Sequence, residues 1–63
     1  GTKQEKTILN MARFIRSQAL TILEKANELD ADEIADIAES IHDHADEIYR
    51  SALARFGDDG ENL

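Results

Sequence analysis

Alanine and isoleucine alternate every three or four residues along most of this chain. This spacing is typical of a heptad seam, in which one stripe of an α-helix packs against a partner. The stripe occurs twice, with a break of a few residues between the two runs. Its members are Ile8, Ala12, Ile15, Ala19, Ile22, Ala26 and Leu29, followed by Ala31, Ile34, Ala38, Ile41, Ala45, Ile48 and Ala52. The pattern predicts two long helices.

Signals for helix ends flank both runs. Thr2 and Glu5 have the spacing of a capping box, and Asp30 with Glu33 repeats that spacing before the second run. Asp30 is therefore the predicted N-cap of the second helix. Gly57 is a residue type that commonly ends a helix.

These boundaries predict a helix-turn-helix hairpin over residues 1–56. It has a helix over about 2–28, a turn at about 28–30 and a helix over about 31–56. Residues 57–63 are polar and acidic and include two of the three glycines, so we expect a flexible acidic tail there.

A break this short makes the two helices antiparallel neighbours. Folding the chain at the break places a large seam residue opposite a small one at each level, which favours interdigitation. One hairpin of 63 residues would still leave the far side of its seam in water. The expected fold class is therefore all-α, a helical hairpin that dimerises into an antiparallel four-helix bundle. The turns of the two hairpins can lie at opposite ends of that bundle or at the same end.

Composition restricts the functional classes. The chain has no cysteine and hence no disulfide. No apolar run reaches the roughly 18 residues of a membrane span, and no signal peptide is recognisable. We expect a cytoplasmic protein with no membrane partner. No serine or cysteine nucleophile motif and no glycine-rich phosphate loop are present, so we expect no enzymatic activity, small-molecule substrate or cofactor.

Glu39 and His42 are three residues apart, a spacing that metal-binding helices use. Ligands in such a bundle would have to point inward, whereas these two residues lie beside the predicted stripe. A solvated helix flank explains them, and we predict no metal site.

The charges are distributed unevenly within a net charge of −7. Residues 1–29 contain five basic and three acidic side chains, whereas residues 30–56 contain two basic and eight acidic ones. This asymmetry is compatible with a nucleic-acid face on an acidic molecule, and equally with two solvated faces of opposite sign.

Phe14 falls outside the predicted stripe, on the outer face of the first helix. It belongs to a surface that we call the outer strip, which consists of Lys3, Asn10, Phe14, Gln18 and Lys25. Lysines neutralise phosphates, amides bond to base edges and an aromatic ring stacks on bases, so the strip suits a nucleic acid. An ordinary surface with one exposed aromatic residue is the alternative.

Several stretches resemble the Rop (repressor of primer) family of plasmid copy-number regulators. They are TKQEKT, LNMARFIRSQ, NELDADE, HDHADE and LARFGDDGENL, and the resemblance covers residues 2–63. It implies a homodimer of helical hairpins that binds the paired hairpin loops of an antisense RNA and a primer-precursor RNA. Stabilising that pair limits primer formation and hence plasmid copy number. The resemblance assigns the RNA contacts to Lys3, Asn10, Phe14, Gln18 and Lys25, with Lys6 and Arg13 nearby.

The seam departs from that family, whose members carry Leu, Thr, Cys and Gln among their seam residues. A uniform seam of alanine and isoleucine is typical of an engineered chain in which the surface was kept and the interior rewritten. The alternative function is therefore a structural four-helix-bundle scaffold, in which the new interior changes the topology and abolishes RNA binding.

Overall fold

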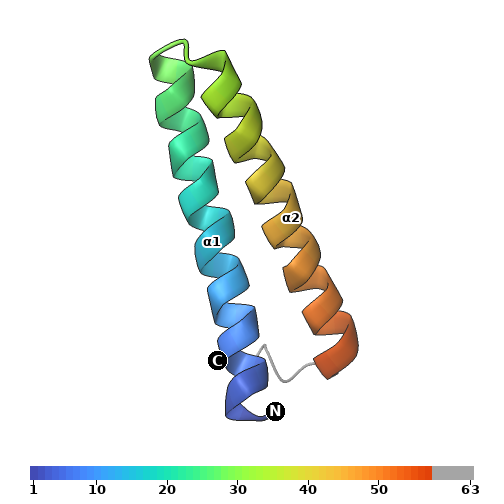
Figure 1. The fold of residues 1–63 in the computed structure, drawn as a ribbon. Helices are drawn as coiled ribbons and strands as arrows, with labels where there is room; N and C mark the ends of the chain where they lie inside the picture. Colours follow the sequence, from blue (N-terminus) through green and yellow to red (C-terminus); the bar gives the residue numbers. More distant parts are fainter. Residues whose placement is uncertain (58–63) are drawn as a thin grey trace.

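The computed structural model describes residues 1–57, which form two antiparallel helices lying side by side (Figure 1). Helix α1 spans Lys3–Glu28 and helix α2 spans Asp32–Phe56. The short connection lies at one end of the hairpin, and the start of α1 lies near the end of α2 at the other. The predicted all-α hairpin is confirmed. The predicted flexible tail falls, apart from Gly57, outside the described residues.

The first turn of α1 forms the predicted capping box. The hydroxyl of Thr2 accepts a hydrogen bond from the backbone N–H of Glu5 at 3.1 Å, and the Glu5 carboxylate accepts one from the Thr2 N–H at 3.0 Å. Two backbone donors that the helix itself leaves without partners are thereby satisfied. This fixes where α1 begins.

The connection between the helices corrects the predicted role of Asp30. Asp30 has a left-handed backbone with φ 57°, and the N-cap of α2 is Ala31, which makes no side-chain capping bond. The Ala31 N–H donates to the carbonyl of Ala26 at 2.8 Å, and the Asp30 N–H donates to that of Asn27 at 3.1 Å. These two bonds form a Schellman motif. Asp30 thus terminates α1 instead of capping α2.

Small residues fill the interface between the helices. The buried side chains of α1 are Leu9, Ala12, Ala19 and Ala26, and those of α2 are Ala35, Ala38, Ala45 and Ala52. Leu9, fully buried, was not among the predicted stripe residues. It lies at the neighbouring heptad position, because a helix in a hairpin buries a wider apolar face than a coiled-coil seam does.

The isoleucines of the predicted stripe remain half-exposed, between 41% and 55% of their surface. We call this set the isoleucine face; its members are Ile8, Ile15, Ile22, Ile34, Ile41 and Ile48. A single hairpin therefore buries its small seam residues and leaves the large ones in water. Contiguous apolar surface of this kind marks an interaction site. Within residues 1–57, neither helix has an apolar stretch long enough to cross a bilayer.

Asp30→Gly is expected to stabilise the chain by about 0.5–1 kcal/mol, because glycine adopts a left-handed backbone without a steric penalty. Urea unfolding followed by circular dichroism measures the change. Asp36→Gly, at an exposed position inside α2, is the control and should destabilise by about 1 kcal/mol. Equal destabilisation by both substitutions would contradict this role of Asp30.

Candidate nucleic-acid interface

All five residues of the outer strip are exposed, and all lie on α1. Phe14 has 56% of its surface exposed, although a phenylalanine ring gains free energy when it is buried. Lys25 forms an ion pair with Glu28 at 3.6 Å. Both side chains are well exposed, and such pairs contribute little energy, so Lys25 remains available to a polyanion. The helix thus presents amines, amides and an aromatic ring to solvent over most of its length.

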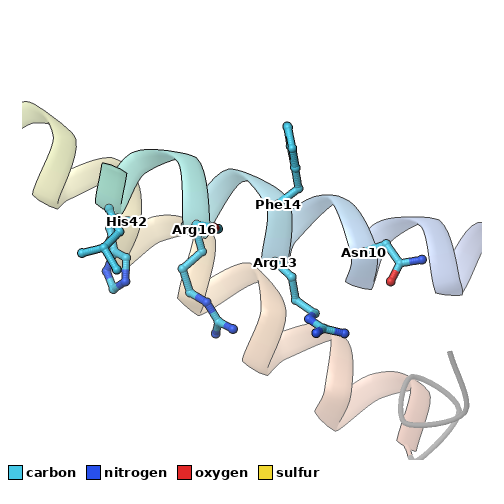
Figure 2. A pocket seen from close by; sticks show the side chains of 7 residues that line it. Asn10, Arg13, Phe14, Arg16 and His42 are labelled. Carbon is cyan, nitrogen blue, oxygen red and sulfur yellow. The ribbon is translucent and has the colours of Figure 1, made fainter. Parts of the chain in front are cut away.

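The two residues predicted to lie near the strip differ in exposure. Lys6 is half-buried, whereas Arg13 is exposed. Arg13 borders a shallow surface hollow together with Asn10, Phe14, Arg16 and His42 (Figure 2). Figure 2 shows Phe14 projecting to one side of α1, while Arg13 and Arg16 extend to the other. The hollow therefore connects the outer strip to α2.

Arg16 joins the two helices through an ion pair that the sequence analysis did not predict. Its guanidinium lies 2.6 Å from the carboxylate of Asp46 and 4.8 Å from the ring centre of Tyr49. Arg50 reaches the other oxygen of the same carboxylate at 2.8 Å. Asp46 and Arg50 are four residues apart, a spacing visible in the sequence. The partner across the hairpin depends on the relative position of α1 and α2, which the sequence does not display.

Asp46 is electrostatically perturbed by this arrangement. The hydrogen bond from Arg16 is the main reason that the pKa of Asp46 lies below its usual value, and the charge of Arg50 adds to it. Desolvation by partial burial opposes both effects. The carboxylate is thus held in its charged form and neutralises Arg16, so Arg16 is a structural link more than a free cation.

His42 lies on α2 beside the hollow, with Nδ1 3.3 Å from the carboxylate of its neighbour Asp43. Glu39 does not join it in a ligand cluster. Over the part of the chain that the structure describes, no three side chains of histidine, cysteine, aspartate or glutamate gather closely enough to hold a metal ion.

The described residues define a small helical-hairpin protein with two distinct faces, one apolar and one polar and basic with an exposed aromatic ring. The family described as Rop protein matches residues 1–57. The regulatory protein rop of Escherichia coli is 86% identical over 62 residues, covering 98% of both chains. The chain belongs to the Rop family, which confirms the resemblance found in the sequence.

The Asp46 ion pairs predict a specific pH dependence of stability. Because the pKa of Asp46 is lowered in the folded chain, its contribution is complete above the ordinary carboxyl value of about 4 and is lost as pH falls through the lower folded value. Asp46→Asn should therefore be less stable than the parent chain near pH 7. The difference should shrink in strongly acidic solution.

Thermal unfolding at several pH values tests this expectation. Glu47→Gln provides the matched control, because Glu47 is exposed and has no ion pair within residues 1–57. A pH-independent difference between Asp46→Asn and the parent chain would show that the ionised carboxylate is not responsible.

Proposed function

We propose that this protein is an RNA-binding regulator that acts in the cytoplasm as a homodimer. In this proposal it stabilises the complex between the hairpin loops of an antisense RNA and a primer-precursor RNA, and thereby limits plasmid copy number. The observation that carries the proposal is the exposed ring of Phe14 on a helix face of lysines and amides, in a chain of the Rop family. The RNA-contacting residues in this proposal are Lys3, Asn10, Phe14, Gln18 and Lys25, with Lys6 and Arg13 beside them.

The chemistry of the outer strip supports an RNA ligand. RNA loops present unstacked bases, and proteins recognise these by aromatic stacking and by hydrogen bonds to base edges. Phe14 supplies the ring, while Asn10 and Gln18 each supply an amide with both donors and an acceptor. Lys3 and Lys25 lie toward opposite ends of α1, where they can meet the phosphates on either side of the stacked bases.

The isoleucine face supports the homodimer. Two copies of the hairpin can cover each other's half-exposed isoleucines, and burying an isoleucine side chain fully is worth roughly 1.5–3 kcal/mol. Dimerisation also duplicates the outer strip. A ligand made of two similar RNA hairpins suits a binding surface with two equivalent halves.

A dimer should have about twice the chain mass of 7.0 kDa in sedimentation equilibrium. Its thermal stability should rise with protein concentration, because association is coupled to folding. Ile15→Lys should abolish association, since it buries a charge in the isoleucine face.

Leu20→Lys is the matched control for the dimer. Leu20 is exposed to nearly the same degree as Ile15, 44% against 41%, but lies outside the isoleucine face. It should leave the mass doubled. Association that survives Ile15→Lys and fails in Leu20→Lys would place the interface elsewhere.

Binding should prefer a pair of complementary RNA hairpin loops over either hairpin alone. Stacking is worth about 1–3 kcal/mol per base, so Phe14→Ala should weaken binding by about five- to 150-fold. Lys3→Ala and Lys25→Ala should each lower the salt dependence of binding by about one phosphate contact per site. Gel-shift titrations at several salt concentrations measure both effects.

Leu29→Ala controls for the loss of an exposed apolar side chain, because Leu29 is 79% exposed and distant in sequence from Phe14. It should retain full affinity. A correctly folded dimer that fails to bind the paired loops would instead support the alternative, a structural bundle whose alanine and isoleucine interior has changed the arrangement of the two strips.

A further inference from the structure

The hollow beside Phe14 extends the polar surface of α1 onto α2. It contains three side chains that are cationic or become so on protonation, Arg13, Arg16 and His42. Arg16 is neutralised by Asp46 at 2.6 Å. Arg13, in contrast, has no carboxylate partner within residues 1–57. The hollow therefore offers one unneutralised guanidinium and one histidine, contributed by different helices.

His42 is held in an orientation that determines its chemistry. Its side chain is 32% exposed, and its Nδ1 lies 3.3 Å from the Asp43 carboxylate. A carboxylate accepts hydrogen bonds only, so this contact favours the tautomer with the proton on Nδ1. The neutral ring then has a lone pair on Nε2 and accepts there. A protonated ring donates from both nitrogens, so only the protonated form can donate to an anion through Nε2.

We propose that protonated His42 and Arg13 together bind an RNA phosphate, so that the RNA footprint crosses from α1 to α2 and binding strengthens as pH falls. This inference rests on the proposed RNA-binding function. A nucleic-acid strand has bases on one side and phosphates on the other. The side chains match this division, because Phe14 projects to one side of α1 while Arg13 and His42 extend on the other (Figure 2).

Several charges act on His42. On its own helix, Asp43 is adjacent, and Glu39 and Asp46 lie about one turn away on either side; these carboxylates favour the protonated ring. From α1, the guanidinium groups of Arg13 and Arg16 disfavour it, the latter weakly because Asp46 neutralises it. A bound phosphate adds a negative charge beside the ring. RNA binding and protonation of His42 therefore promote each other.

The test compares the affinity for two complementary RNA hairpins at pH 6 and pH 8 and fixed salt. Histidine changes its charge in this range, so the parent chain should bind about three- to tenfold more tightly at the lower pH. His42→Gln should bind equally at both pH values. His42→Lys should bind tightly at both, because its charge is permanent. Arg13→Gln should weaken binding at both.

His44→Gln is the matched control. His44 is also exposed on α2, but its Nδ1 is bonded to the Ser40 carbonyl at 2.9 Å and it does not border the hollow. It should keep the pH dependence of the parent chain. Binding whose pH dependence persists in His42→Gln would overturn this inference alone. Absence of binding at every pH would overturn the proposed function together with it.

Discussion

Close packing of alanines between α1 and α2 is the constraint on which the rest of this molecule depends. Helix separation is set by the side chains at the contact, and alanine allows a short one. The alanines of both helices consequently disappear from solvent, while the isoleucines of the same stripe stay half-exposed beside them. Since the hairpin has no third layer, its largest apolar side chains require a second molecule. The interior of one chain thus dictates an interface.

The same packing separates the polar functions of the two helices. Residues on the outer face of α1 have no role in the hairpin interior, and this leaves Phe14 and the amides and amines around it available for a ligand. Arg16 has a different role, because Asp46 and Tyr49 of α2 hold it. Two arginines three residues apart, Arg13 and Arg16, therefore serve as a free cation and a structural link. Their distinction comes from the partner across the hairpin.

The turn illustrates how a local signal can be interpreted in two ways. Asp30 has both the spacing of an N-cap for α2 and a side chain that tolerates the left-handed conformation at the end of α1. The sequence analysis chose the first and was wrong. In the structure, the backbone bonds from Asp30 and Ala31 back to α1 close the helix end before α2 begins. Bonds to carbonyls of the preceding helix leave no mark in the residue pattern.

The sequence by itself determined the two helices, the capping box at Thr2 and the exposed position of the outer strip. These follow from a helical period and from contacts within one turn, which neighbouring residues define. Only the tertiary structure decided that the alanines are buried while the isoleucines remain open, that Leu9 belongs to the interior, and that Arg16 pairs with Asp46. Each of these depends on the rotation and axial position of one helix against the other. The packing of many side chains fixes that relationship together, and no single stretch of sequence encodes it.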